Sequence, residues 1–389
     1  PSLFFDDTGK VYVTSAQNWG AVKNRIVMSE IDITTGKLLS EPVTIWKGTG
    51  GKYPEGPHLY KKDGFYYLMI AEGGTEYGHK VTIARSKNIW GTYESNPANP
   101  ILTHANSNEE NNPIQGTGHA DLVQTTDGSW FMVALGFRPL NDHQILGRET
   151  FLAPVVWNPN EWPIVNGTGS ISLDMKVDKL PGQLSVKNYD QMEDFSKGQL
   201  GLEWNYINNP IPQNYSLTER KGYLRLLGSE KSLSENPGVT FVGRRQQQFN
   251  FNAVTTIDFN PITDNEEAGI TMYKDALHHY KLFIRKIGKE RELVLAYHIG
   301  TIKAVEKRIP LKKGTVKLSV SGTPEFYEFG FSQENDSITT LGKVETKYLS
   351  TETAGGFTGA YIGLYATGNN AKSKATADFD NFNYKVVQQ

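Results

Sequence analysis

The stretch Tyr53-Pro54-Glu55-Gly56-Pro57-His58-Leu59-Tyr60 continues directly into Lys-Lys-Asp-Gly-Phe-Tyr-Tyr-Leu, which ends at residue 68. Its dipeptide Asp63-Gly64 favours the tight turn between two antiparallel strands, and aromatic and aliphatic residues flank it on both sides. Residues 53–68 therefore predict a β-hairpin, with the carboxylate of Glu55 at the entrance to its first strand.

The hairpin pattern occurs twice more. One copy is Pro1-Ser-Leu-Phe-Phe-Asp-Asp-Thr-Gly-Lys-Val-Tyr-Val, and the other is His119-Ala-Asp-Leu-Val-Gln-Thr-Thr-Asp-Gly-Ser-Trp-Phe-Met-Val. Further strand-like residues follow the first two hairpins, at 26–33 and 81–94. Four short strands in roughly 60 residues is the repeat of a β-propeller blade. The sequence predicts three blades before residue 183, fewer than the four or more that close a propeller.

A different pattern begins at Asp194-Phe195. Alternating apolar and polar residues without the hairpin pattern predict strands at 223–227, 254–259, 280–284, 293–297, 316–320 and 361–365. Such a series of strands predicts a β-sandwich of the jelly-roll type. The polar stretch Lys179-Leu-Pro-Gly-Gln-Leu-Ser-Val-Lys separates the two patterns. We therefore expect a linker there and two all-β domains, at 1–183 and 188–389.

The composition excludes several classes of function. The formal net charge is −2 over 389 residues, without the basic footprint of a nucleic-acid-binding protein. No apolar run approaches the roughly 20 residues of a transmembrane helix. The absence of cysteine excludes disulfides, thiolate metal sites and a cysteine nucleophile. The chain starts at Pro1 and its first methionine is Met28, so we expect it to begin inside a larger protein. The compartment, whether periplasmic, secreted or cytoplasmic, is left open.

Glu55 is the first candidate for chemistry. The innermost strand of each propeller blade runs along the central channel, so a residue that enters this strand lies at the rim where ligands bind. Desolvation among aromatic side chains would raise the pKa of Glu55, which suits a general acid. The alternative is a surface glutamate in a turn.

His119 and Asp121 are the next candidates. An inward-facing histidine on a propeller strand can bind a sugar hydroxyl, orient a carboxylate or bind a metal ion. Asp121 follows two positions later, on the same face of the strand. The alternative is a histidine whose hydrogen bonds are satisfied within the core.

Three further charged residues each allow two interpretations. Arg148 stands at the start of an apolar strand, where its guanidinium could donate to substrate hydroxyls or to a catalytic carboxylate, or form a salt bridge to Glu149 or another acid. Glu72 and Glu76, in Ala71-Glu-Gly-Gly-Thr-Glu-Tyr, are alternative acids or residues of a solvated loop.

Several motifs together resemble a known family. They are the stretch around Glu55 followed by Ala71-Glu-Gly-Gly-Thr-Glu-Tyr, Ile83-Ala-Arg-Ser with Trp90-Gly-Thr-Tyr-Glu, Gly116-Thr-Gly-His-Ala-Asp-Leu-Val, Leu146-Gly-Arg-Glu-Thr-Phe, and Gly355-Gly-Phe-Thr-Gly-Ala-Tyr-Ile-Gly-Leu-Tyr. The chain resembles glycoside hydrolase family 43, of the β-xylosidase and α-L-arabinofuranosidase type, with a C-terminal concanavalin-like sandwich. The resemblance covers essentially the whole chain.

The resemblance implies a five-bladed propeller, of which this chain holds about the last three blades, and inverting hydrolysis of xylosyl or arabinofuranosyl residues. Glu55 would be the general acid, His119 and Arg148 would bind the sugar or the carboxylates, and Phe357 would help to close the pocket. The base Asp, and a second Asp that tunes the acid, would lie upstream of residue 1. No cofactor is required, and a calcium ion at the propeller centre, with His119 as a candidate ligand, stays open.

Other functions remain open at this stage. The chain could be a carbohydrate-binding protein without catalysis, because the expected base is not in the sequence. A retaining five-bladed fructosidase would need a nucleophilic Asp and different residues around the acid. The expected partner is a xylo- or arabino-oligosaccharide, with no nucleic acid or membrane partner, and the oligomeric state stays open.

Overall fold

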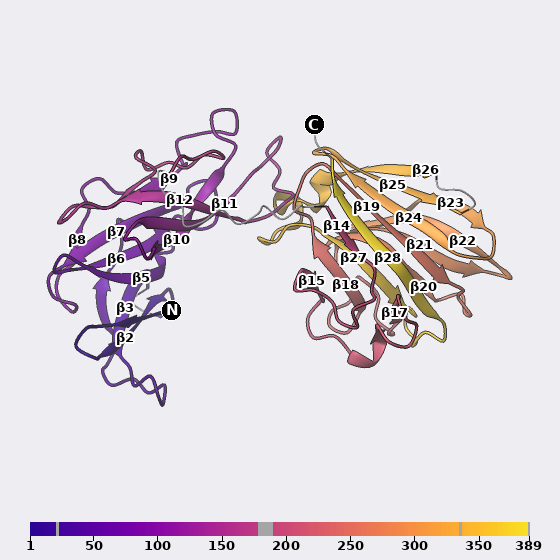
Figure 1. The fold of residues 1–389 in the computed structure, drawn as a ribbon, viewed down its shortest axis with the longest axis horizontal. Helices are drawn as coiled ribbons and strands as arrows, with labels where there is room; N and C mark the ends of the chain where they lie inside the picture. Colours follow the sequence, from indigo (N-terminus) through magenta and orange to yellow (C-terminus); the bar gives the residue numbers. More distant parts are fainter. Residues whose placement is uncertain (21–22, 178–189, 334–336, 388–389) are drawn as a thin grey trace. The chain divides into compact units, whose positions relative to one another are not determined.

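The computed structural model describes residues 1–20, 23–177, 190–333 and 337–387, and its strands establish an all-β fold (Figure 1). The chain divides into two units, the first made of residues 1–142 and 148–184 and the second of residues 143–147 and 185–389. Within the described residues, helical structure is limited to short segments of the second unit: η1 (Pro212–Asn214), η2 (Thr346–Leu349) and α1 (Thr351–Ala354). The predicted linker Lys179–Lys187 lies outside the described residues.

Each hairpin of the sequence repeat opens one antiparallel sheet of the first unit. The sheets have the strand orders β1-β2-β3-β4, β5-β6-β7-β8 with β9 paired to β7, and β10-β11-β12-β13. The strands are β1 (Ser2–Phe5), β2 (Val11–Gln17), β3 (Arg25–Glu30), β4 (Val43–Trp46), β5 (Glu55–Lys62), β6 (Phe65–Glu72), β7 (Lys80–Ser86), β8 (Glu94–Ser95), β9 (Leu102–Thr103), β10 (Gln115–Gln124), β11 (Trp130–Phe137), β12 (Glu149–Val156) and β13 (Ile164–Val165).

The three sheets pack against one another as propeller blades do. Strand β6 of the second sheet has side chains buried on both faces. Leu68 and Ile70 join a core shared with the first sheet, whereas Tyr67 and Met69 join a core shared with the third. The alternation of side chains along a strand lets one strand contribute to both cores. Each fully buried side chain of this size stabilises the fold by roughly 1.5–3 kcal/mol.

Both inner strands that carry site residues are bulged. Between the paired residues Glu55 and His58, two residues of β5, Gly56 and Pro57, face the single residue Ile70 of β6. Strand β10 has two such register shifts, between Gln115 and Gly118 and between Gly118 and Asp121. A bulge bends the strand and redirects its side chains. The predicted strand at His119 is therefore longer than expected, because it begins at Gln115 and continues through the bulges.

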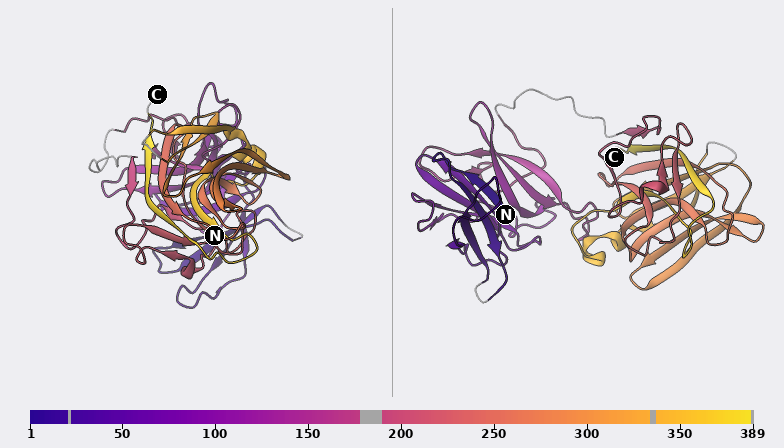
Figure 2. Two further views of the ribbon diagram at one scale, coloured as in Figure 1. Left: turned by 90° about the vertical axis from the view of Figure 1, so that its right-hand side faces the viewer. Right: turned by 90° about the horizontal axis from the view of Figure 1, so that it is seen from below.

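The second unit is a sandwich of two sheets (Figure 1; Figure 2 gives two further views). Of the six strands predicted after residue 194, five fall within its strands, and the sixth, 223–227, begins one residue before the observed strand at Leu224–Leu227. One sheet is β16 (Tyr215–Ser216), β17 (Leu224–Leu227), β28 (Thr376–Val386), β19 (Phe251–Phe259), β24 (Val316–Gly322), β25 (Phe326–Ser332) and β26 (Thr339–Glu345), with β14 (Gln191–Glu193) paired to β28. The other is β15 (Trp204–Asn205), β18 (Thr240–Arg245), β27 (Tyr361–Thr367), β20 (Glu267–Asp275), β21 (His278–Ile287), β22 (Glu290–Ile299) and β23 (Ile302–Leu311).

Apolar side chains of the sandwich form two cores, one on each face of the β15–β23 sheet. The main core lies between the sheets and includes Phe251, Leu282 and Leu364. A smaller core with Phe241 and Phe283 covers the opposite face of the β15–β23 sheet. The central strands of this sheet are therefore buried on both faces, which explains the near-continuous burial of β20 and β22.

A short segment from between β11 and β12 belongs to the second unit. In residues 143–147, Ile145 is buried in the main sandwich core. Its carbonyl accepts a hydrogen bond from the backbone N–H of Ala360 at 3.2 Å, and Gly147 forms a β-bridge with Thr358. Five residues of the chain between two blade strands are thus a structural part of the sandwich.

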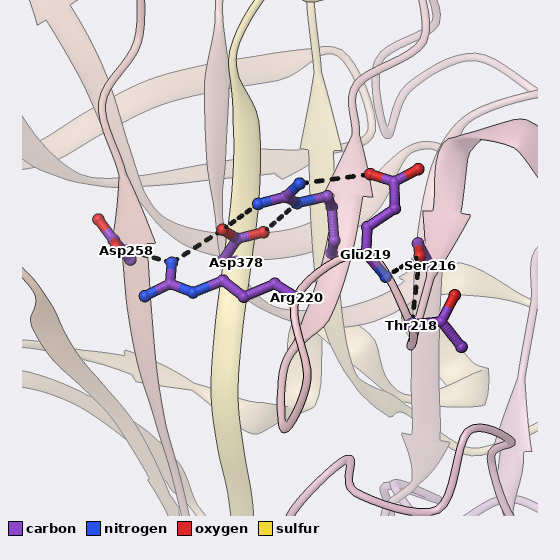
Figure 3. Close-up of polar contacts among 7 residues, drawn as sticks. Ser216, Thr218, Glu219, Arg220, Asp258 and Asp378 are labelled. Atoms are coloured by element: carbon purple, nitrogen blue, oxygen red, sulfur yellow. Dashed lines mark hydrogen bonds and ion pairs between the residues drawn. The ribbon is translucent and has the colours of Figure 1, made fainter.

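An ion-pair network stabilises the outer face of the β16–β26 sheet (Figure 3). Arg220 donates to Asp258 and to Asp378, both at 2.8 Å, and Asp378 also binds Arg225 through two hydrogen bonds of 2.7 and 2.9 Å. The side chain of Asp378 is only 7% exposed. Burial raises the pKa of Asp378, but the two arginines outweigh it and hold the pKa below its ordinary value.

None of the helices in the described part of the chain is long and apolar enough to cross a membrane.

Candidate functional site

The first candidate residue, Glu55, begins the inner strand of the second blade. The residue after it, Gly56, has a φ of +56°, which a glycine adopts without steric cost. This left-handed residue is part of the β5 bulge. The Glu55 carboxylate is 34% exposed, so it is accessible but partly desolvated. Glu55 is therefore not the freely solvated turn glutamate that was the alternative interpretation of the sequence.

His119 reaches Glu55 from the neighbouring inner strand. Nδ1 of His119 lies 3.5 Å from Oε1 of Glu55. His119 has a φ of +43°, a conformation that is uncommon for a residue with a side chain and that clusters at functional sites. The side chain of His119 is 41% exposed, so it is not a core histidine. The structure therefore brings together the two candidates that the sequence places 64 residues apart.

The charge environment of Glu55 differs from the sequence expectation. Hydrogen bonding from His119 outweighs desolvation and holds the pKa of Glu55 below its ordinary value, with further contributions from His79 and Arg148. The expectation that burial would raise this pKa is wrong for the residues described, because a nearby hydrogen-bond donor favours the charged carboxylate.

Arg148 stands immediately before β12. Its charge contributes to the lowered pKa of Glu55, so it acts on the same group as His119. Glu149, the salt-bridge partner that the sequence offered as an alternative, is bound by Arg138 through two hydrogen bonds of 2.9 and 2.7 Å. The two oxygens of Glu149 are thus both used by a different arginine.

A second set of polar contacts joins the strands β1, β5 and β10. Asp121 accepts a hydrogen bond of 2.5 Å from the hydroxyl of Tyr60, and Nδ1 of His58 lies 3.7 Å from the carboxylate of Asp121. His58 also contacts the hydroxyl of Ser2, on β1, at 3.3 Å. Asp121 and His119 both contact residues of β5, but Asp121 contacts Tyr60 and His58, whereas His119 contacts Glu55.

Glu72 is not a second acid. It is fully buried, and its carboxylate accepts hydrogen bonds from the backbone N–H groups of Thr49 and Gly51 and from the hydroxyls of Thr49 and Thr82, at 2.6–3.1 Å. It therefore holds the loop that leads to Glu55, rather than lying in a solvated loop. Glu76 is exposed, as the sequence predicts for a loop residue.

His79 is a site residue that the sequence analysis missed. It is fully buried, and burial lowers its pKa below the ordinary value. Its only sequence signal is its place at the end of the Gly-rich loop, in Gly78-His79. Its contacts involve β10, which is distant in the sequence.

Two protein-family models match this chain. Residues 1–163 match the model of glycosyl hydrolases family 43, and residues 192–385 match that of the β-xylosidase C-terminal concanavalin A-like domain. A non-reducing end α-L-arabinofuranosidase of Bacteroides ovatus is 40% identical over 100% of this chain and 72% of its own length. The chain belongs to glycoside hydrolase family 43.

Other family 43 members show the same relationship. A β-xylosidase of Bacillus subtilis is 32% identical over 99% of this chain and 76% of its own. A solved Bacteroides ovatus structure named xyloglucan PUL GH43B matches with a TM-score of 0.93 at 39% identity, over 100% of this chain and 75% of that one. The xylan β-1,4-xylosidase of Bacillus halodurans matches with a TM-score of 0.92 at 32% identity, over 99% and 76%. This family 43 chain is therefore a glycoside hydrolase, as the sequence predicts.

Two predictions about the family 43 site stay predictions. Phe357 lies in the second unit, three residues after α1, and is 50% exposed; its predicted role in closing the pocket is not tested. The described residues contain no group of three or more His, Asp or Glu side chains that could hold a metal ion. Calcium takes six to eight oxygen ligands, so His119 with the single carboxylate of Glu55 does not by itself fit this ion.

Proposed function

We propose that the site around Glu55 removes terminal xylosyl or arabinofuranosyl residues from plant cell-wall xylan or arabinan oligosaccharides by inverting hydrolysis. The observation that carries the proposal is the contact between Glu55 and His119 at the entrance of the inner strand of a family 43 blade. The sugar class follows from relatives that are named arabinofuranosidase and β-xylosidase.

In this proposal Glu55 is the general acid. Its carboxyl proton passes to the glycosidic oxygen as the bond between that oxygen and the anomeric carbon breaks. A second carboxylate takes a proton from the water that attacks the opposite face, and it must stand about 6.5–9.5 Å from the first to admit that water. The family resemblance assigns this base to an Asp upstream of residue 1.

The lowered pKa of Glu55 requires an opposing influence before the residue can donate a proton at neutral pH. His119, His79 and Arg148 all favour the charged form. A carboxylate close to Glu55 would favour the protonated form and raise its pKa. The tuning Asp that the resemblance places before Pro1 is a group of this kind. His119 and Arg148 would then bind the sugar or hold the carboxylates, and Phe357 would cover the pocket.

The decisive variant is Glu55→Gln in the protein, assayed on a xylo- or arabino-disaccharide and on activated aryl glycosides. We expect kcat on the disaccharide to fall by about 10²–10⁴-fold, because its leaving group needs a proton. The loss on an aryl glycoside with an acidic phenol should be much smaller. Glu76→Gln, an exposed carboxylate of the same blade, is the matched control. An equal loss on both substrate classes would contradict the acid assignment.

The same preparation tests the alternative of a carbohydrate-binding protein without catalysis. Calorimetry with xylo-oligosaccharides measures binding, and a reducing-sugar assay measures hydrolysis. Binding without hydrolysis by the unsubstituted protein would support the alternative and overturn the proposal.

A further inference from the structure

The side chain of His79 connects the second blade to the inner strand β10 of the third. It is fully buried just before β7, and its Nδ1 lies 3.0 Å from the carbonyl oxygen of Gly116 in β10. A carbonyl accepts hydrogen bonds, so Nδ1 carries the proton and Nε2 is the bare acceptor nitrogen. Nε2 is buried and has no hydrogen-bond partner among the described residues.

The ring of His79 also covers the backbone of Gly118. A Cβ atom at Gly118 would lie 2.5 Å from three atoms of the imidazole, Cγ, Cδ2 and Cε1. Equal distances to atoms on both sides of the ring mean that its face lies on the α-carbon of Gly118. Position 118 therefore tolerates no side chain while His79 occupies this place.

These two contacts hold the part of β10 that is out of register. Gly116 lies in the first register shift, and the second begins at Gly118. His79 binds the carbonyl in the first shift and packs on the residue that separates the two. The next residue is His119, whose left-handed backbone directs its imidazole to Glu55.

We propose that His79 is a positioning residue for the general acid: it fixes the bulge of β10 and thereby holds His119 against Glu55. The proposal rests on the proposed function of Glu55. His79 itself touches neither substrate nor the reacting atoms in this scheme. It acts through the backbone of residues 116–119.

His104, a second buried histidine of the same unit, has the hydrogen bonds expected of a purely stabilising residue. His104 also binds a carbonyl through Nδ1, that of Ile114, at 2.6 Å. Its Nε2 accepts from the N–H of Ile171 at 3.1 Å and contacts the hydroxyl of Ser170 at 2.9 Å. Both ring nitrogens of His104 are bonded, whereas the ring of His79 has, among the described residues, only the bond to the bulge. The bulge is therefore the contact that accounts for a histidine at 79.

Three substitutions separate the contributions of His79. His79→Asn keeps an amide donor near the position of Nδ1, His79→Phe keeps a ring over Gly118, and His79→Ala removes both. We expect His79→Ala to lower kcat on a disaccharide by about 10²-fold with little change in KM, since small displacements of catalytic groups have effects of this size. The loss on an activated aryl glycoside should be smaller, and His79→Asn should recover part of the activity.

A double-substitution cycle distinguishes positioning from a general loss of structure. In the Glu55→Gln background the effect of His79→Asn on disaccharide hydrolysis should disappear, because the residue acts through Glu55. His104→Asn is the matched control, and it should lower Tm without changing the dependence on the leaving group.

If the effect of His79→Asn stays the same in the Glu55→Gln background, the proposal is wrong even where Glu55 is the acid. If Glu55→Gln alone does not change the rate of hydrolysis of either substrate, the proposed function itself is wrong. Should His79→Ala not fold, the Asn and Phe variants decide the question.

Discussion

The imidazole of His119 occupies the space that a side chain at Gly56 would need: a Cβ atom there would lie 2.7 Å from Nε2 of His119. Gly56 also has a left-handed backbone. The residue after the candidate acid must therefore be glycine for two reasons: its backbone is left-handed, and a side chain there would collide with His119. This explains physically why Glu-Gly-Pro is an informative motif.

Gly56→Ala should separate His119 from Glu55. We expect kcat to fall by about 10²-fold, because the methyl group displaces the imidazole from the acid. Steady-state kinetics on a disaccharide measures the loss. Gly64→Ala is the control, since Gly64 has a φ of +75° but an open surrounding with nothing within 4 Å of the added atom. Both variants should lose about 1–2 kcal/mol from the left-handed strain. Equal kinetic losses would mean that strain, and not the contact with His119, is responsible.

Glu72→Gln should destabilise the first unit. The carboxylate accepts hydrogen bonds from donors on the 48–51 loop and on β7, and an amide in its place turns an N–H group towards some of these donors. A buried donor left without a partner costs about 1–3 kcal/mol. Calorimetry of the protein should show a lower Tm for Glu72→Gln, whereas the exposed Glu76→Gln should unfold at the original temperature. A Tm equal to that of the unsubstituted protein would contradict the buried anchoring role.

Asp378→Asn should weaken the sandwich in a pH-dependent way. The folded-state pKa of Asp378 is lowered, so its stabilising contribution is complete above the unfolded value and is lost as the pH falls through the folded one. The unfolded value is near 3.8. We expect a loss of about 2 kcal/mol at pH 7, from broken hydrogen bonds to charged groups. The difference between variant and original protein should shrink as the pH drops below about 4.

The control for this prediction is Asp258→Asn. Asp258 contacts Arg220 in the same network, but its side chain is 41% exposed. An exposed ion pair contributes less than about 1 kcal/mol. Scanning calorimetry between acidic and neutral pH compares the two variants. A pH-independent effect of Asp378→Asn would show that its carboxylate is not the titrating group.

The strand pairs of the first unit could be predicted because their signals are local. Asp63-Gly64 and the aromatic residues beside it lie within one hairpin, and β5 and β6 form where this pattern indicates. Strand β20 was not predicted, since its burial on both faces depends on neighbours that are far away in the sequence. The true start of β10 was missed for a similar reason, because Gly116 and Gly118 are of a residue type that is depleted in strands and they pair only through the bulges.

The candidate site was predictable in composition but not in electrostatics. Glu55, His119 and Arg148 each have a recognisable local motif, and the structure brings the first two into contact. The direction of the pKa shift of Glu55 could not be predicted, because it depends on which side chain reaches the carboxylate. His79 was missed because its partners are two glycines of another blade, and glycines carry no side-chain signal of such a contact.

The segment at residues 143–147 has a consequence for how the protein is made. Ile145 leaves the ribosome long before Ala360, whose N–H binds its carbonyl. The sandwich core therefore cannot be completed until its last strands are synthesised, although Ile145, one of its side chains, is synthesised much earlier, together with the blades. A gene fragment that starts after residue 184 would encode a sandwich with an empty place in its core. A cut at a single point of the chain therefore cannot separate the two units without removing Ile145 from the sandwich core.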